Sequence, residues 1–298
     1  MPAHQPRRRF HTVVDDAWLG AQGCVFSGRL THARAAPAEE AGRWRSLRRT
    51  TRMLLTAGAV GEVALSVGSH RWTTRADARG YWQHVAPAPL PLAAGWHDIS
   101  ADPAASTPAG LLVPDARNAF GIISDVDDTI LVTHVLSKRD LLANSLTLPA
   151  EKRMCVDGMP DLYRRLLQQN AAPESSPVFY ISSSPRQLTD NLRRFLHSHG
   201  FPRGVLQLRQ IVSKRREPER DHTTYKCARI ESVLASYPNV RFALFGDDGE
   251  TDPEVYASIQ ALRPRQVAGI YIRRVHPNPS RPRYPDHLDT GELLARLQ

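Results

Sequence analysis

Three acidic residues interrupt an apolar run at residues 121–132, which read GIISDVDDTILV. Asp125 and Asp127 directly follow the stretch AFGIIS, whose composition is typical of a buried strand. Successive side chains of a strand point to opposite faces, so these two carboxylates should share a face while Val126 points away. Such a pair repels itself unless it binds a cation, shares a proton or stays in water. We interpret the pair first as a magnesium site with a nucleophile, and a solvated turn is the alternative.

A serine-rich segment follows the second apolar run, in VFYISSSPRQLTDNLRRFLHSHG. Ser184, Pro185 and Gln187 predict a capping box, with proline at the first position of a helix. Ser182 is left at the end of the strand, beside a helix N-terminus whose free N–H groups attract anions. We therefore expect Ser182 to donate to a phosphate group, and a hydroxyl without a functional role is the alternative.

Lys226 lies in the first turn of a helix that should begin near Thr223 or Thr224. A cation at this position opposes the helix dipole, at a cost of about 0.3 to 1 kcal/mol for an exposed site. An anionic group nearby would remove this cost. The alternative interpretation of Lys226 is an ordinary surface lysine.

A second acidic group follows the fourth apolar run, in RFALFGDDGETDPEVY. Asp247 and Asp248 come directly after the strand, and Asp247 has no evident structural role. Asp252 precedes a proline and is a natural N-cap, so capping and metal binding both stay open for it. Gly246 and Gly249 are expected to let the backbone turn tightly and to bring the carboxylates back towards the first strand.

The elements that must position these residues form the second part of the chain. Five apolar runs alternate there with segments of helical pattern: AFGIIS, VFYIS, VLQLRQIV, RFALFG and AGIYIRRV. This alternation predicts an α/β domain with a parallel five-stranded core sheet. Right-handed crossovers place the carboxyl ends of all the strands along one edge of the sheet, where such folds build their sites.

The first part of the chain has a different pattern of apolar and polar residues. Runs such as GCVFSGRL, GEVALSVGSHRWTT and GYWQHVA alternate apolar and polar residues, which predicts antiparallel strands and a small β-sandwich. The segment at residues 43–55, RWRSLRRTTRMLL, predicts a basic amphipathic helix, which could anchor the protein to a membrane surface or pack on its own sandwich with a solvated face. A Pro- and Ala-rich stretch at residues 102–118 marks the boundary. We assign residues 1–110 to the sandwich with its helical insertion and residues 117–298 to the α/β domain.

Composition limits the class of partner. The net charge of +9 favours partners that carry phosphate or anionic lipid. Three cysteines without a CxxC pair support neither a disulfide framework nor a thiolate zinc site, so we expect a reducing, cytoplasmic setting. No apolar stretch approaches the roughly 20 residues that span a bilayer, so contact with a membrane would be peripheral. Aromatic residues are 7% and form no stacking platform, so no nucleic-acid partner is expected.

Taken together, the motifs resemble those of a known superfamily. DVDDT, a strand-final serine, a lysine and GDDGETD are similar, in order and spacing, to the four motifs of the haloacid-dehalogenase-like (HAD) phosphatases. The longer signatures ISDVDDTI, FYISSSP, FGDDGETDPEVY and AGIYIRRV resemble the actin-patch-type phosphatidate phosphatase family over most of residues 118–275. The N-terminal runs are similar to the β-domain that precedes the catalytic domain in bacterial members. The resemblance implies a HAD-like Rossmannoid fold for the second domain.

The resemblance also implies a role for each residue. Asp125 would be the nucleophile that forms an aspartyl-phosphate, and Asp127 would protonate the departing alcohol and then activate water. Thr129 would support this loop beside the substrate, while Ser182 and Lys226 would hold the phosphoryl oxygens. The implied Mg²⁺ ligands are Asp125, Asp127 through its backbone carbonyl, Asp247, and Asp252 or Asp248.

The implied function is Mg²⁺-dependent hydrolysis of phosphatidic acid to diacylglycerol and phosphate. Together with the cysteines, the charge and the short apolar stretches, it leads us to expect a cytoplasmic protein that binds peripherally to the anionic inner face of the membrane. SSSPR stands where the family often has SNSPW, so Ser183 and Arg186 would alter the mouth of the pocket. The segment of about 50 residues between Thr129 and the second strand is too short for a large cap, and an open site suits a bulky substrate. The alternatives are a HAD phosphatase for a nucleotide, sugar phosphate or phosphoprotein, and a non-catalytic phosphatidate-binding module.

Overall fold

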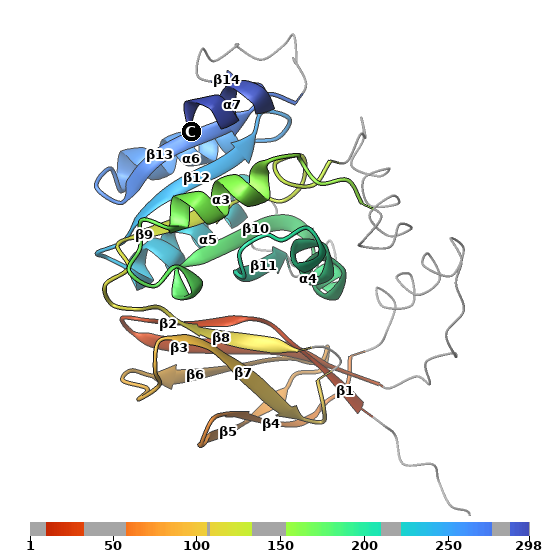
Figure 1. Cartoon of the computed structure of the whole chain (residues 1–298). Coiled ribbons are helices and arrows are strands. Elements are labelled where there is room, and N and C mark those ends of the chain that lie inside the picture. Colours follow the sequence, from red (N-terminus) through yellow and green to blue (C-terminus); the bar gives the residue numbers. More distant parts are fainter. Residues whose placement is uncertain are drawn as a thin grey trace, which may run out of the picture. The chain divides into compact units, whose positions relative to one another are not determined.

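The computed structural model describes residues 10–32, 58–105, 108–132, 153–209, 222–275 and 287–297 (Figure 1). The chain divides into two compact units. The first comprises Met1–Leu92 and Trp96–Val113, and the second Ala93–Gly95 and Pro114–Gln298. The basic helix expected at residues 43–55 lies outside the described residues. Among the helices that are described, none has the length and apolar character that crossing a membrane requires.

The first unit is built from strands. Their bounds are β1 (Phe10–Val14), β2 (Ala17–Gly20), β3 (Gly23–His32), β4 (Gly61–Val67), β5 (His70–Ala76), β6 (Tyr81–Pro87), β7 (Gly95–Asp102) and β8 (Ala109–Val113). They form one hydrogen-bonded network in the order β1-β3-β2-β8-β7-β4-β5, with β6 on the other edge of β3. Most of the pairs are antiparallel, as expected, whereas β2 and β8 run parallel. The sandwich arrangement stays a prediction.

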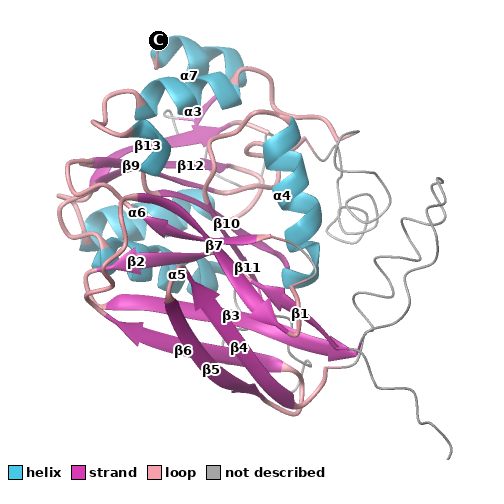
Figure 2. Ribbon diagram, turned by 60° about the horizontal axis from the view of Figure 1, so that its bottom comes forward, coloured by secondary structure: helices cyan, strands magenta, loops and turns pink. Residues whose placement is uncertain are grey.

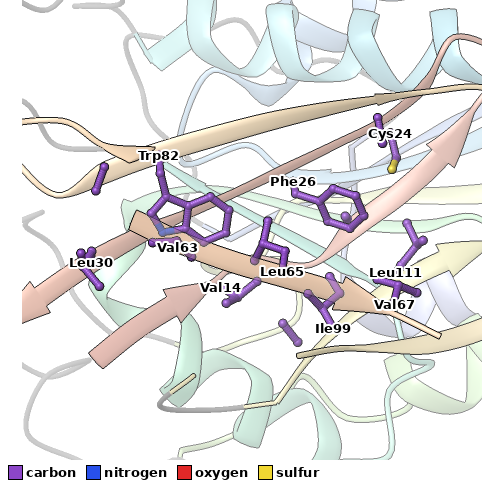
Figure 3. Packing of buried hydrophobic residues seen from close by; sticks show 14 of the residues in the cluster. Val14, Cys24, Phe26, Leu30, Val63, Leu65, Val67, Trp82, Ile99 and Leu111 are labelled. Carbon is purple, nitrogen blue, oxygen red and sulfur yellow. The ribbon is translucent and has the colours of Figure 1, made fainter. Parts of the chain in front are cut away.

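Alternation along β3 explains how this unit forms its core. Cys24, Phe26 and Leu30 are buried, whereas Val25 between them is exposed, as the period of a strand dictates. Phe26 and Trp82 belong to one buried apolar cluster (Figure 3). Burial of each such aromatic side chain stabilises the fold by roughly 1.5 to 3 kcal/mol.

The second unit contains a parallel sheet. Its strands are β9 (Phe120–Ser124), β10 (Val178–Pro185), β11 (Val205–Arg209), β12 (Arg241–Asp247), β13 (Val267–Arg273) and β14 (His287–Leu288). The order is β11-β10-β9-β12-β13-β14, and every pair is parallel. The predicted α/β class with a parallel sheet is therefore confirmed, and the two-residue β14 extends the expected five strands to six.

Helices flank this sheet (Figure 2). They are α3 (Met159–Leu167), α4 (Thr189–Ser198), α5 (His222–Ser236), α6 (Asp252–Leu262) and α7 (Thr290–Arg296), together with short 3₁₀ turns at Pro173–Ser175 and Arg186–Leu188. Figure 1 shows α3 on one face of the sheet and α5 on the other. The central strands β9 and β12 are almost entirely buried, as apolar strands covered on both faces must be.

The capping box predicted around Ser184 is wrong. β10 continues to Pro185, a 3₁₀ turn covers Arg186–Leu188, and α4 begins only at Thr189 with no side-chain cap. The reason is that the Ser184 hydroxyl bonds to an acidic side chain of another strand end, described below, instead of to the start of the helix.

Candidate active site

The site is built on the carboxyl end of β9. The hydrogen bonding between β9 and β12 continues one residue beyond the end of β9, where the Asp125 N–H donates to the Phe245 carbonyl over 2.8 Å. It then turns at Asp128, whose φ of 55° lies in the left-handed region that residues other than glycine seldom adopt. Asp125 is buried at this position, with 3% of the residue exposed.

Lys226 reaches this carboxylate from the first turns of α5. Its Nζ lies 2.7 Å from Asp125 Oδ1 and also forms an ion pair with Asp252. Lys226 is 2% exposed, so it is not the surface lysine of the alternative interpretation. Burial by itself would lower the pKa of Lys226, but the two carboxylates outweigh burial and raise this pKa well above its ordinary value. The ammonium group therefore keeps its charge.

Three buried carboxylates gather around this lysine. Asp125, Asp247 and Asp252 each offer an oxygen, and these oxygens all lie within 4.8 Å of one another. Gly249 N–H donates to Asp247 Oδ1 over 2.7 Å, whereas Asp247 Oδ2 is buried and has no hydrogen-bond partner among the residues that the structure describes. Burial first, and then the neighbouring negative charges, raise the pKa values of Asp125 and Asp247 well above the ordinary range. This donor set, with one oxygen left unpaired, fits a hard divalent cation such as Mg²⁺.

The structure separates the two acids that the sequence left as alternatives. Asp252 is the first residue of α6, and its carboxylate contacts Lys226 and accepts from the Asp247 N–H over 3.3 Å. Asp248 instead accepts from the Val275 N–H over 2.8 Å, just beyond β13. Thr251, rather than Asp252, is the N-cap of α6, so the N-cap interpretation of Asp252 is wrong.

Gly249 lies in the bend that follows β12, where its N–H donates to Asp247 Oδ1, whereas Gly246, the last but one residue of β12, acts through close packing. Neither adopts a positive φ. Gly246 is needed because a Cβ at its position would lie 2.7 Å from both Asp252 Cβ and the Tyr256 ring. The absence of a side chain at Gly246 therefore lets α6 bring Asp252 against the end of β12.

Asp127 is held by the end of β10. Its Oδ2 accepts from Ser182 Oγ over 2.9 Å and from Ser184 Oγ over 3.0 Å. Burial raises the pKa of Asp127, and the two serine hydrogen bonds oppose this rise because they favour the ionised form. Sequence reasoning missed Ser184, although the period of two along a strand puts it on the same face as Ser182.

Thr129 completes the loop that carries these acids. Its hydroxyl is buried and donates to Asp125 Oδ2 over 3.3 Å. The structure thus brings together Asp125, Thr129, Lys226, Asp247 and Asp252 as one group, with Asp127 bonded to Ser182 and Ser184.

Comparisons with known proteins locate this site within a family. The family model "Phosphatidate phosphatase APP1, catalytic domain" matches residues 120–274, which include every residue of the site. Phosphatidate phosphatase APP1 of Saccharomyces cerevisiae is 31% identical over 175 residues, or 58% of this chain and 28% of that protein. An uncharacterized protein of Schizosaccharomyces pombe is 28% identical over 160 residues, or 53% of this chain and 26% of its own length. The matches thus cover only about a quarter of these relatives.

A solved structure of the Pnkp1/Rnl/Hen1 complex is similar with a TM-score of 0.34 and 13% identity, covering 55% of this chain and 48% of that one; this similarity is too weak to assign a fold. The family assignment rests on the match over residues 120–274. The chain therefore belongs to the family of phosphatidate phosphatase APP1 catalytic domains, as the resemblance of its motifs implied.

Proposed function

We propose that this protein is a Mg²⁺-dependent phosphatidate phosphatase, which hydrolyses phosphatidic acid to diacylglycerol and phosphate through an aspartyl-phosphate. The observation that carries the proposal is the pairing of a buried carboxylate with a buried lysine, Asp125 with Lys226, beside a second carboxylate held by two serines. Membership of the phosphatidate phosphatase APP1 family supports the substrate class.

In the first step, an Asp125 oxygen attacks the phosphorus, and the bond from phosphorus to the lipid oxygen breaks. The departing oxygen takes a proton from Asp127, whose raised pKa favours the protonated form required for this transfer. Lys226 stays charged and has N–H capacity beyond its two carboxylate contacts, so it can donate to a phosphoryl oxygen.

In the second step, Asp127, now ionised, removes a proton from a water molecule. The water oxygen attacks phosphorus, the bond to Asp125 breaks, and inorganic phosphate leaves. The two serine donors, Ser182 and Ser184, orient the Asp127 carboxylate during both proton transfers.

Asp125, Asp247 and Asp252 are the side chains that would hold Mg²⁺, with the Asp127 carbonyl as a further ligand implied by the family resemblance. When bound, the cation neutralises part of the carboxylate charge and polarises a phosphoryl oxygen. Asp248 is left out of this ligand set because its carboxylate is bonded to the backbone beyond β13.

We also propose that the second unit has the HAD-like Rossmannoid fold and that the first unit is a β-sandwich. The order β11-β10-β9-β12-β13, with the acids at the carboxyl ends of β9 and β12, supports the first proposal. The buried apolar cluster that the described strands of the first unit share supports the second. The free cysteines and the net charge of +9 support a cytoplasmic protein that binds peripherally to an anionic membrane. The aromatic content of 7%, without a stacking platform in the sequence, supports the lack of a nucleic-acid partner.

The test is phosphate release by the full chain with Mg²⁺, from phosphatidate vesicles and from a panel of soluble monoesters that includes a nucleotide, a sugar phosphate and a phosphopeptide. We expect release from the vesicles, and its loss in Asp125→Asn, which removes the nucleophile. Release from soluble esters alone would identify a phosphatase for another monoester. No release from any ester, with vesicle binding unchanged in Asp125→Asn, would identify a non-catalytic lipid-binding module.

A further inference from the structure

Arg153 is a buried cation that has no hydrogen-bond partner among the described residues. Its side chain is 5% exposed, and Nε, Nη1 and Nη2 have no hydrogen-bond acceptor within the part of the chain that the structure describes. Arginine is almost never buried unless it is paired, because its charge and its five N–H donors lose water. A buried guanidinium whose nitrogens are all unpaired therefore points to an anionic ligand that is not part of the described chain.

The backbone ties Arg153 to the loop of the candidate site. The residues that follow it pair with the residues that follow Thr129: Val132 N–H donates to the Met154 carbonyl and Val156 N–H to the Ile130 carbonyl, each over 2.9 Å. These two bonds hold residues 154–156, which directly follow Arg153, beside the loop that carries Asp125 and Asp127.

The charge environment places Arg153 on the Asp127 side of the site. Burial lowers the pKa of Arg153 to about 10, the Asp127 carboxylate acts against this decrease, and Arg194 adds to it. The guanidinium is therefore still charged at neutral pH. Asp127 itself accepts its hydrogen bonds from Ser182 and Ser184. Arg153 therefore interacts with this carboxylate through its charge and not through a hydrogen bond.

The excess of negative charge at the site explains why a further cation would be needed to bind a phosphate group. The described site has four buried or half-buried carboxylates, Asp125, Asp127, Asp247 and Asp252, and the single ammonium group of Lys226 bonded among them. A phosphomonoester dianion adds further negative charge, which one divalent cation does not neutralise. A guanidinium presents its donors in a planar fork that matches two oxygens of a phosphate group.

We propose that Arg153 is a substrate-binding residue, which donates to non-bridging oxygens of the phosphate group of the monoester next to Asp127. The proposal rests on the proposed function and deepens it. Lys226 would contact the phosphate from the side of Asp125 and Asp252, and Arg153 from the side of Asp127. The ligand class is a phosphate with at least two unesterified oxygens, so monoesters and inorganic phosphate should bind and diesters should not.

The experiment compares Arg153→Gln and Arg153→Lys with the wild type in the full chain. It measures kcat and KM with a monoester that the wild type hydrolyses, inhibition by inorganic phosphate, and the rise in Tm that inorganic phosphate causes. We expect Arg153→Gln to raise both KM and the inhibition constant of phosphate by about tenfold or more, with a smaller change in kcat, because a charged hydrogen-bonding partner is lost. Arg153→Lys keeps the positive charge but loses the planar guanidinium. Its KM and its inhibition constant for phosphate should lie between those of the wild type and of Arg153→Gln.

Arg194→Gln is the matched control. Arg194 is exposed, its Nε donates to the Asp190 carbonyl, and its charge also acts on Arg153, so this variant removes one positive charge nearby without removing a buried donor. It should leave KM and phosphate inhibition within about twofold of the wild type.

The outcomes separate this proposal from the proposed function. If the wild type hydrolyses no monoester but phosphate raises its Tm, and Arg153→Gln loses this rise, the proposed function fails while the phosphate site stands. If Arg153→Gln is folded and keeps the wild-type KM and phosphate inhibition, the role of Arg153 is disproved. Should Arg153→Gln fail to fold, wild-type values in Arg153→Lys for KM, phosphate inhibition and the phosphate-dependent Tm would also disprove it.

Discussion

Ser184 Oγ donates to Asp127 Oδ2 over 3.0 Å, although 57 residues separate the two in the chain. The same oxygen accepts from Ser182 Oγ, so two hydroxyls of β10 fix the carboxylate that follows β9. Each hydrogen bond favours the ionised carboxylate and opposes the effect of burial on its pKa. The proposed acid and base is therefore oriented by a neighbouring strand rather than by its own loop.

Ser184→Ala should lower kcat by roughly tenfold, because a hydrogen bond to a charged group is worth about 1.5 to 3 kcal/mol and its loss lets the Asp127 carboxylate rotate. Steady-state kinetics with a saturating monoester would measure this change. Ser198→Ala serves as the control, since the Ser198 hydroxyl contacts the Phe195 carbonyl and the ring of His199 near the end of α4, away from the site. Equal kcat values for both variants would show that Ser184 does not orient Asp127.

Mg²⁺ should stabilise the wild type but not Asp247→Asn. A ligand at 100 times its dissociation constant stabilises the folded state by about 2.7 kcal/mol, which raises Tm by roughly 5 to 10 °C for a unit of this size. Asp247→Asn removes a carboxylate from the buried group and with it most of the attraction for the cation. Thermal unfolding with and without Mg²⁺ would measure the difference.

Asp248→Asn is the matched control for this measurement. It changes the neighbouring residue in the same way, but the Asp248 carboxylate accepts from the Val275 N–H and lies outside the acidic group. We expect Asp248→Asn to keep the Mg²⁺-dependent rise in Tm. A loss of the rise in Asp248→Asn, with its retention in Asp247→Asn, would reverse our choice of ligand.

Gly246→Ala should damage the site through packing. The new Cβ would lie 2.7 Å from Asp252 Cβ and from the Tyr256 ring, so α6 must move away from β12. We expect a loss of about 1 to 3 kcal/mol of stability from overpacking, together with weaker stabilisation by Mg²⁺. Chemical denaturation would measure both, with Gly291→Ala near the start of α7 as the control. The Gly291 Cβ would meet nothing closer than 3.4 Å, so this variant should keep the wild-type response to Mg²⁺.

The thiol of Cys24 should resist alkylation in the folded protein. Burial raises the pKa of Cys24 from 9.0 to about 12, because the thiolate would lose its hydration. The neutral thiol therefore favours the folded state below pH 9.0, and this contribution disappears as the pH rises through about 12. Mass spectrometry of the alkylated protein at pH ~8.5 should show an unmodified Cys24 in buffer and a modified one in denaturant. Rapid modification in buffer would contradict the burial of Cys24 in β3.

The sequence was sufficient to predict the α/β fold class of the second unit. Runs such as AFGIIS and RFALFG are apolar throughout, which predicts strands covered on both faces, and β9 and β12 are buried in this way. It was insufficient at the end of β10, where the serine, proline and glutamine pattern predicted a helix start. Capping patterns depend on which partner a hydroxyl finds, and here the Asp127 carboxylate competes successfully for Ser184.

The sequence by itself determined that Asp125, Ser182 and Asp247 would meet, because parallel strands align their carboxyl ends whatever the loops between them do. Only the tertiary structure decided that Asp252 and not Asp248 joins them, and that Arg153 is buried with no hydrogen-bond partner in the described parts of the chain. These outcomes depend on how closely α6 approaches β12 and on how residues 154–156 pair with residues 130–132. Contacts between segments distant in the chain set both, and no local pattern of residue types encodes them.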